Sequence, residues 1–322
     1  MPSNRKRDLQ MTNKTLIIQP LPGLGDMLWY MPYLKTIARN TESGKISILT
    51  KRKSQTHHLF RGENFVDEVI FLEDELFNKK SKLDLLKEIK SKKFTESWVL
   101  HHSPKYDWLC ALAGITKRHG YGFGWQKYLQ NSGVLIDSKF RREMPIPRAA
   151  ALLEKYGYEI ESHDLTLTPS KEAKLPPRYT SFKKPWTVLG VGASQKFKQW
   201  PAEKFAELAT QLDKELKGTV ILLAHNSEQR TVNEITSLLK NTKNVVTATD
   251  LRLDQTILLL SQSELYLGNC SGPLNIAASV NIPSYGLFGT TDVLDFNENI
   301  IPITSPKKSA KPTMGDIQVE DV

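Results

Sequence analysis

Short β-rich runs alternate with helical stretches along almost the whole chain, and this alternation is the strongest constraint on the fold. A β-rich run over residues 15–19 is followed by a helical stretch over 26–39. The same order begins again after residue 185, with a strand over 186–191 and a helix over 202–216. Strands that alternate with helices form parallel sheets covered by helices. Because 322 residues exceed one ordinary core, the sequence predicts an α/β protein with two Rossmann-like domains.

Proline residues mark the boundary between the two predicted domains. Pro169, Pro176, Pro177 and Pro185 lie among mostly polar residues, and proline supports neither helix interiors nor sheet ladders. We therefore predict a linker over residues 169–185, between an N-terminal domain of residues 14–168 and a C-terminal domain of residues 186–300. Residues 1–13 are expected to be a flexible extension. Residues 301–322 are expected to form an extended or loosely packed tail.

The net positive charge lies entirely in the first part of the chain. Residues 1–178 contain 30 Lys and Arg against 20 Asp and Glu, a net charge of +10, and residues 179–322 carry −1. Such asymmetry favours an anionic partner, which could be a nucleic acid, a membrane surface or a phosphorylated substrate. A lysine-rich solvated face would explain the charge equally well.

Other features place the chain in the cytoplasm. No apolar run approaches the roughly 20 residues that span a bilayer. Residues 1–10 are polar and unlike a signal peptide, and translation could also start at Met11. Cys110 and Cys270 are far apart in sequence, which excludes a disulfide framework. We expect a soluble protein in a reducing compartment.

The first candidate motif is Gly23-Leu-Gly-Asp26, between a predicted strand and a predicted helix. Glycine there permits a tight turn and the close approach of a ligand to the backbone. Asp26 lies near the helix N-terminus, where a role as helix cap would explain it equally well.

Two more strand–helix junctions carry candidate ligand-binding residues. Gly192, Ser194, Lys196 and Lys198 offer N–H, hydroxyl and ammonium groups that suit a diphosphate. The small residues of Gly268–Asn275 would let a phosphate reach the free N–H groups of the next helix. Both junctions could also be ordinary turns. Glu228 follows a predicted strand at the sheet edge where α/β proteins bind ligands, although a surface glutamate is favoured there too.

Histidines and aromatic residues give weaker signals. His57-His58 and His101-His102 are adjacent pairs, and neighbours on a strand point to opposite faces. We therefore expect no metal site. No RNA-binding signature is present, so we expect no nucleic-acid partner.

Taken together, these segments resemble glycosyltransferase family 9, the ADP-heptose:lipopolysaccharide heptosyltransferases. The similarity covers most of the chain from Thr15 onward. It rests on Gly25-Asp26 with Pro32, His102-Ser-Pro-Lys105, Arg118-His-Gly-Tyr121, Lys198-Gln-Trp-Pro201, Ser271-Gly-Pro273 and the stretch from Pro283 to Asp292.

The resemblance implies the GT-B fold, with two Rossmann-like domains whose parallel sheets face across a cleft. It implies inverting, metal-independent transfer of a sugar, most simply heptose from ADP-heptose, to a lipopolysaccharide core or a related anionic glycolipid. The basic first domain would bind the acceptor, and the second would bind the nucleotide sugar. We expect a monomer without a cofactor, peripheral on the inner face of the cytoplasmic membrane.

Individual residues receive roles from the same resemblance. Asp26 would act as general base, and Lys198 would stabilise the departing diphosphate. The donor would be bound by Ser194, Glu228, Cys270, Ser271, Gly272 and Asn275, and the acceptor by Gly25, Lys105 and Arg118.

The chain departs from the family pattern at two positions. Cys270 replaces an aspartate and Asn275 a histidine of the donor motif. The alternative function is therefore a non-catalytic GT-B protein or one with another specificity, such as a different nucleotide-sugar transferase or an epimerase.

Overall fold

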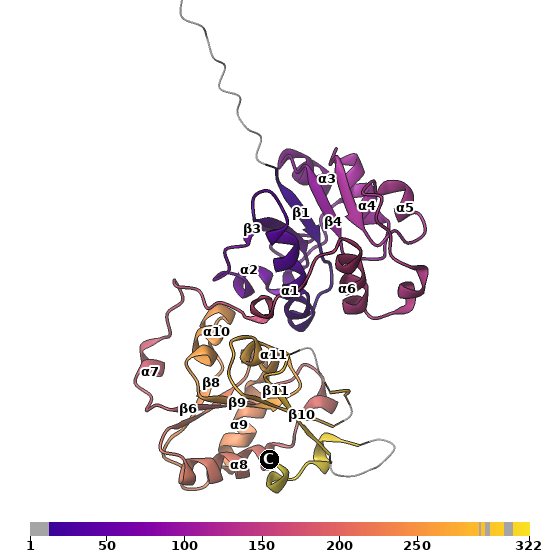
Figure 1. Cartoon of the computed structure of the whole chain (residues 1–322). Coiled ribbons are helices and arrows are strands. Elements are labelled where there is room, and N and C mark those ends of the chain that lie inside the picture. The colour runs from indigo at the N-terminus through magenta and orange to yellow at the C-terminus, as the bar shows by residue number, and fades with distance from the viewer. Residues whose placement is uncertain (1–12, 290, 294–296, 306–311) are drawn as a thin grey trace, which may run out of the picture. The chain divides into compact units, whose positions relative to one another are not determined.

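A computed structural model describes residues 13–289, 291–293, 297–305 and 312–322, and the chain folds into two units (Figure 1). Of the described residues, the first contains 13–22, Tyr30–Ser54 and Asn64–Asp164. The second contains Gly23–Trp29, Gln55–Glu63 and Leu165–Val322. The predicted extension, apart from residue 13, lies outside the described residues.

The first unit is built on a five-stranded, fully parallel sheet of order β3-β2-β1-β4-β5. Its strands are β1 Thr15–Ile18, β2 Ile46–Thr50, β3 Val66–Phe71, β4 Glu96–Val99 and β5 Lys117–Gly120. The central strands β1 and β2 are buried throughout. Continuous apolar runs are typical of parallel strands that are covered on both faces.

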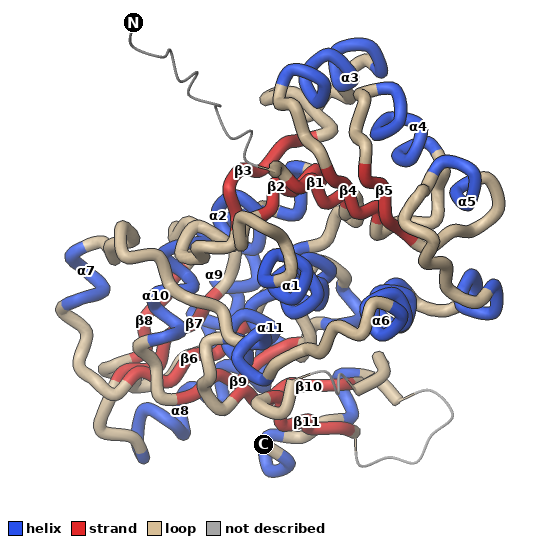
Figure 2. Tube along the Cα trace, turned by 45° about the horizontal axis from the view of Figure 1, so that its top comes forward, coloured by secondary structure: helices blue, strands red, loops and turns tan. Residues whose placement is uncertain are grey.

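Helices cover both faces of this sheet (Figure 2). One face carries α3 Lys82–Ser91, α4 Lys105–Leu112 and the short α5 Gln126–Leu129. The other face carries α1 Leu24–Arg39 and α6 Pro145–Lys155. Ile89 of α3 and Cys110 of α4 pack on Leu16, Ile18 and Val99 in one buried cluster.

The second unit is built on a six-stranded parallel sheet of order β11-β10-β9-β6-β7-β8. Its strands are β6 Trp186–Gly190, β7 Thr219–Leu223, β8 Val245–Ala248, β9 Leu265–Asn269, β10 Ser284–Phe288 and β11 Ile300–Thr304. Its helices are α2 Thr56–Leu59, α7 Pro177–Thr180, α8 Ala202–Glu215, α9 Gln229–Leu238, α10 Leu253–Ser261 and α11 Gly272–Ser279. The predicted α/β architecture with two parallel sheets is confirmed.

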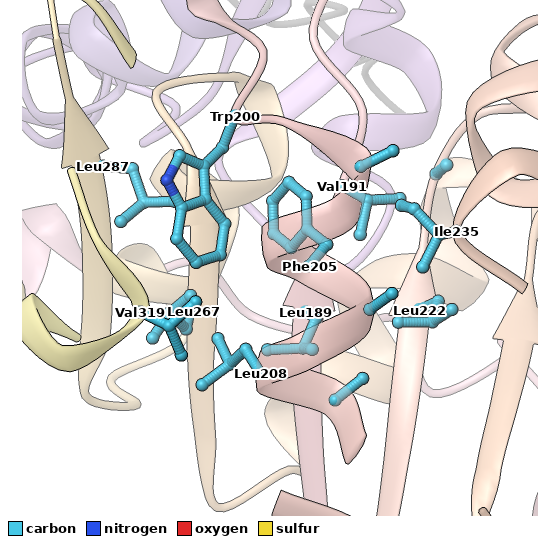
Figure 3. Close-up of a cluster of buried hydrophobic side chains, with 14 of the residues drawn as sticks. Leu189, Val191, Trp200, Phe205, Leu208, Leu222, Ile235, Leu267, Leu287 and Val319 are labelled. Carbon is cyan, nitrogen blue, oxygen red and sulfur yellow. The ribbon is translucent and has the colours of Figure 1, made fainter. Parts of the chain in front are cut away.

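The core of the second unit is centred on Trp200 and Phe205 (Figure 3). Their rings meet edge to face, with centroids 4.9 Å apart, a favourable aromatic geometry. Leu189 and Leu222 supply the sheet side of the cluster. This packing holds α8 against the sheet and fixes the end of the loop that leads into it.

The described C-terminal residues correct one prediction, because they are not loosely packed. β11 pairs with β10, and the side chains of Met314, Ile317 and Val319 are buried in the core of the second unit. The Trp200 ring nitrogen donates to the Ile317 carbonyl at 3.0 Å. A Cβ on Gly289 would lie 2.5 Å from the Met314 backbone nitrogen, so this position requires glycine for packing rather than for a ligand.

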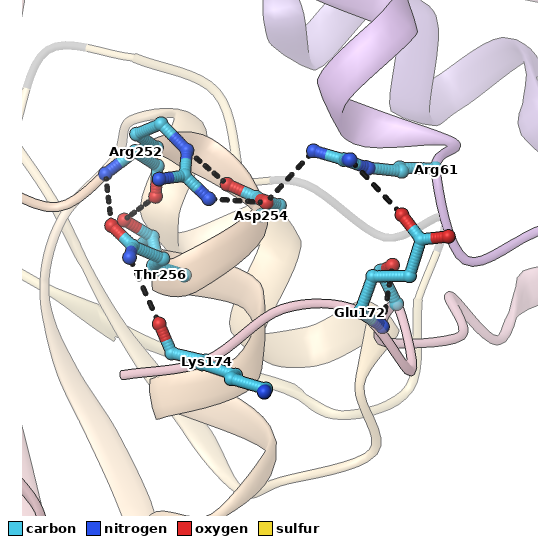
Figure 4. A network of polar contacts seen from close by, with 8 residues as sticks. Arg61, Glu172, Lys174, Arg252, Asp254 and Thr256 are labelled. Atoms are coloured by element: carbon cyan, nitrogen blue, oxygen red, sulfur yellow. Dashed lines mark hydrogen bonds and ion pairs between the residues drawn. The ribbon is translucent and has the colours of Figure 1, made fainter. Parts of the chain in front are cut away.

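A polar network ties residues 55–63 to the second unit, although the sequence placed them in the N-terminal domain (Figure 4). Arg61 forms ion pairs with Glu172 at 3.0 Å and with Asp254 at 3.5 Å. Arg252 also binds Asp254, at 3.0 Å. Burial by itself raises the pKa of the Asp254 carboxyl, but Arg252 and Arg61 bring it below its usual value.

Candidate active site

The predicted phosphate-binding junctions meet at one edge of the second sheet. β9, β6 and β7 are neighbours, so the loops that follow them share the carboxyl edge, where open α/β sheets bind ligands. A Cβ on Gly192, after β6, would lie 2.0 Å from Oε2 of Glu228, after β7. Any larger residue there would force the Glu228 carboxylate to move.

Glu228 also has a structural role at this edge. Its Oε2 accepts a hydrogen bond from the His225 N–H at 2.9 Å and closes a capping box at the start of a short 3-10 turn. The side chain is half-buried. The capping bond therefore fixes the carboxylate in place beside Gly192.

The loop between β6 and α8 carries the predicted cationic groups. Ser194 and Lys196 are exposed, and Lys198 is half-buried. Lys198 lies near enough to Cys270 for its ammonium group to affect the thiol. The structure therefore places Lys198, rather than Lys196, beside the junction after β9.

Asn269, which the sequence analysis did not single out, holds this loop. Its Oδ1 accepts from the Trp200 N–H at 2.9 Å, and its Nδ2 donates to the Val191 carbonyl at 2.8 Å. Asn269 is fully buried at the end of β9. A single side chain thus clamps both ends of the Gly192–Lys198 loop to the neighbouring strand.

Loss of this clamp is the first testable expectation. Asn269→Ala leaves a buried donor and a buried acceptor unpaired, which should lower the free energy of unfolding of the second unit by roughly 2–4 kcal/mol. Urea unfolding with the matched variant Asn233→Ala, at an exposed position on α9, measures the difference. Equal unfolding midpoints for the two variants would show that the Asn269 hydrogen bonds do not stabilise the second unit.

Cys270, which the resemblance assigns to donor binding, is buried rather than open to a ligand. Only 7% of the residue is exposed. Burial raises the pKa of the Cys270 thiol, although the nearby Lys198 ammonium and a hydrogen bond with Thr291 oppose the rise. The thiol is neutral at physiological pH and packs as a small apolar group, as buried free cysteines do.

The first turn of α11 contains the other predicted donor residues. Ser271 is its N-cap, and Gly272 is its first residue. Asn275 is 5% exposed and donates from Nδ2 to the Ser271 carbonyl at 3.2 Å. Within the described chain, its buried Oδ1 has no hydrogen-bond partner. An unpaired buried oxygen is costly and suits a site completed by a ligand.

The start of α1 lies against the same turn of α11. A Cβ on Gly25 would be 3.4 Å from Nδ2 of Asn275, and one on Gly272 would be 3.0 Å from Leu24. These contacts explain why residues 23–29 group with the second unit. The structure thereby brings the Asp26 turn next to the predicted donor motif.

Asp26 occupies the third position of α1, where its Oδ2 accepts from the Gly23 N–H at 2.9 Å. Burial raises the pKa of the Asp26 carboxyl above its ordinary value, and this hydrogen bond opposes the rise. Helix capping therefore accounts for one of the two carboxylate oxygens of Asp26. A partly buried carboxylate with a raised pKa is suited to proton abstraction.

The two predicted acceptor residues of the first unit differ in their surroundings. Arg118 donates to the carbonyls of Leu129 and Ile115, both at 2.6 Å, so its guanidinium is largely engaged by the backbone. Lys105 is exposed at the start of α4. Desolvation and the positive charges of Lys79 and Lys51 lower its pKa.

Lys105 belongs to a larger cationic cluster that the sequence did not reveal. Burial lowers the pKa of His101 to about 4, assisted by the positive charges of His102, Lys105, Arg148 and Lys51. Lys51 follows β2, and the histidines follow β4, so parallel pairing brings them to one edge of the first sheet. The sequence analysis did not find this cluster, because its members are far apart in sequence and Lys51 lies in a loop. Accumulated positive charge at a sheet edge favours an anionic ligand.

The described parts of the chain contain no group of three or more His, Cys, Asp or Glu side chains that could hold a metal ion. His57 and His58 are neighbours with ring centroids 3.9 Å apart and lie on the short helix α2.

Solved structures share this architecture across nearly the whole chain. ADP-heptose lipopolysaccharide heptosyltransferase II of E. coli superposes with a TM-score of 0.73 at 22% identity, and 96% of each chain is covered. The glycosyl transferase family 9 protein of Veillonella parvula gives a TM-score of 0.73 at 15% identity, over 96% of this chain and 94% of that one. At these identities the likeness establishes the fold.

Curated relatives agree with the structural likeness. Lipopolysaccharide heptosyltransferase 2 of Escherichia coli K12 is 27% identical over 216 residues, which is 62% of this chain and 61% of that protein. The chain thus matches about three fifths of that relative's length. Lipooligosaccharide heptosyltransferase 2 of Campylobacter jejuni is 26% identical over 83% of this chain and 78% of that protein. The family model described as glycosyltransferase family 9 (heptosyltransferase) matches residues 82–312, well over half of the chain, and the chain therefore belongs to this family.

Proposed function

We propose that this protein is an inverting glycosyltransferase that moves heptose from ADP-heptose onto a lipopolysaccharide core or a related anionic glycolipid. The observation that carries the proposal is the juxtaposition of the Asp26 turn with the first turn of α11. A candidate base thereby lies beside a helix N-terminus suited to phosphate. The names of the family's relatives, which are heptosyltransferases, support heptose as the sugar.

Asp26 acts as the general base in this mechanism. Its carboxylate takes the proton of the acceptor hydroxyl while the hydroxyl oxygen bonds to the anomeric carbon. The bond from that carbon to the diphosphate oxygen breaks at the same time, and the electron pair leaves with ADP. The raised pKa of the Asp26 carboxyl makes it a stronger base than an exposed aspartate.

One cationic group and several hydrogen-bond donors stabilise the departing diphosphate. Lys198 supplies an ammonium group, Ser194 a hydroxyl and the first turn of α11 its free N–H groups. Asn275 can contribute through its amide, and Glu228 binds the ribose hydroxyls of the nucleotide. In this proposal no metal or cofactor is needed, because the Lys198 ammonium supplies positive charge and the other groups donate hydrogen bonds.

The cationic edge of the first sheet binds the acceptor. Lys105, Lys51 and Arg148 suit phosphate or carboxylate groups of a glycolipid. Arg118 contributes by holding Leu129 and Ile115 in place more than by contacting the ligand. Gly25 permits close approach of the acceptor to the Asp26 turn.

The proposed cellular location follows from the proposed glycolipid acceptor. No helix in the described part of the chain is both long and apolar enough to cross a membrane. We propose a monomer that works in the cytoplasm and associates peripherally with the inner membrane through its basic first half.

A nucleotide panel tests the donor assignment. ADP should raise the melting temperature more than GDP or UDP, because binding to the folded state stabilises it by mass action. Labelled ADP-heptose should then be consumed only when a heptose-deficient glycolipid acceptor is present. ADP binding without transfer would favour the non-catalytic alternative, and conversion of the sugar without acceptor would favour an epimerase.

A further inference from the structure

The first unit exposes aromatic and aliphatic side chains on the outer surface of α4 and α5. Trp108 and Leu112 of α4 are 50% and 60% exposed, and Trp125 and Tyr128, at α5, are each 70% exposed. Trp108 and Leu112 lie one turn apart on the same side of α4, and Tyr128 of α5 lies three residues after Trp125, the N-cap of that helix. The Trp125 and Tyr128 ring centroids are 5.8 Å apart. Such a group of exposed large apolar residues marks an interaction surface.

A buried polar clamp fixes these two helices to each other. Asp107 of α4 accepts hydrogen bonds from the amides of Gln126 and Gln130 at 2.8 and 2.7 Å, and all three side chains are buried. The clamp engages the inner side of α5. It therefore holds Trp125 and Tyr128 outward on a rigid support.

Lysines lie next to several of these side chains. Lys105 begins α4, in line with Trp108, and the Lys127 ammonium lies 4.9 Å from the Tyr128 ring centroid. Lys79 lies close enough to Lys105 to lower its pKa. We call the surface formed by Trp108, Leu112, Trp125 and Tyr128, with Lys79, Lys105 and Lys127, the aromatic–lysine face.

The loop that carries Lys79 adds two further apolar side chains. Leu76 is 80% exposed and Phe77 is 66% exposed. Asp74 organises the loop, since its Oδ1 accepts from the N–H groups of Leu76 and Asn78 at 2.9 and 2.8 Å. The acidic side chain of Asp74 is thus engaged within the loop, which presents Leu76 and Phe77 to solvent.

The geometry points to the aromatic–lysine face as the surface that docks on an anionic lipid bilayer, an inference that rests on the proposed function. Tryptophan and tyrosine favour the membrane interface, and lysines near them are attracted by anionic headgroups. Lys79, Lys105 and Lys127 disfavour a second copy of this chain as occupant, because pairing the face with itself would oppose like charges. The face also adjoins the loops at the carboxyl edge of the first sheet, where a lipid-anchored acceptor would arrive.

Vesicle flotation with the full chain tests this surface without turnover. The native protein should float with phosphatidylethanolamine–phosphatidylglycerol vesicles at low salt and much less with phosphatidylcholine vesicles. Trp125→Ser/Tyr128→Ser and Lys127→Glu should each weaken vesicle binding roughly tenfold or more. Leu76→Ser/Phe77→Ser measures the contribution of the loop. Leu238→Ser and Lys240→Glu, at exposed positions of the second unit, are the matched controls and should bind like the native chain.

Three outcomes would overturn the inference. They are native-like binding by the Trp125→Ser/Tyr128→Ser and Lys127→Glu variants, equal native binding to both vesicle types, and a self-association that Trp125→Ser/Tyr128→Ser abolishes without any vesicle binding. Transfer to a deacylated, soluble acceptor should be unchanged in these variants. If the native chain lacked that transfer while vesicle binding followed the prediction, the proposed function would fail and the docking surface would stand.

Discussion

Asp26→Asn is expected to lower kcat for sugar transfer by ~10²–10⁴, the usual contribution of a general base. Asparagine keeps the shape of the side chain, and its amide oxygen can still accept from the Gly23 N–H. It cannot take a proton from the acceptor hydroxyl. ADP affinity and melting temperature should therefore change little, and single-turnover transfer beside calorimetric ADP binding measures the two effects separately.

The pH dependence of kcat provides a second test of Asp26. Burial raises the folded-state pKa of Asp26, so kcat should fall as the pH is lowered through that pKa and the base becomes protonated. This acidic limb should be absent in Asp26→Asn. Asp84→Asn is the matched control, because Asp84 holds the same third position in α3. If Asp26→Asn transferred sugar at the native rate, Asp26 would be only a helix cap.

The apolar strands were the part of the fold that sequence reasoning located best. β6 and β7 are buried along their whole length, and residues buried on both faces form runs that are recognisable locally. β5 was missed, since its sequence Lys-Arg-His-Gly has no apolar pattern. It is stabilised by distant residues: His119 stacks on Trp98 with centroids 4.3 Å apart and pairs with Glu96 at 3.0 Å.

The packing of β11 and of the described residues after it was missed for a related reason. Pro302 within β11 and the Lys-, Pro- and Ser-rich stretch that follows argued against regular structure. β11 is paired only with β10 in the sheet order, and an edge strand tolerates proline. The burial of Ile317 depends on Trp200, more than a hundred residues earlier, and no local pattern encodes that contact.

At the site too, the sequence predicted the features that depend on neighbouring residues and missed those that depend on distant ones. Glycine turns at strand–helix junctions are local signals, and the sequence placed Gly25 and Gly192 at such turns. The engagement of Arg118 by backbone carbonyls and the burial of Cys270 depend on tertiary packing. Asn269 gave no signal because its two partners lie about 70 residues or more away in sequence.

Lys198→Ala is expected to slow transfer by roughly 10²–10³, as loss of one group that stabilises a departing anion does. The same variant should weaken ADP binding, because the proposed mechanism has the ammonium group contact the diphosphate before and during bond cleavage. This double effect distinguishes Lys198 from Asp26, whose loss should leave ADP binding nearly intact. Isothermal calorimetry with ADP and single-turnover transfer measure both quantities in one preparation.

Lys196→Ala is the control variant, because it separates the effect of the position of a lysine from the effect of its charge. Lys196 lies two residues earlier in the same 3-10 turn and carries the same charge, but it is exposed, whereas Lys198 is half-buried beside Cys270. Loss of a solvated charge is screened and should change ADP affinity only slightly. If both variants weakened ADP binding equally, the loop would act through its summed charge. If Lys198→Ala slowed transfer with ADP affinity unchanged, Lys198 would act only in the transition state, and the N–H groups of α11 would hold the diphosphate in the ground state.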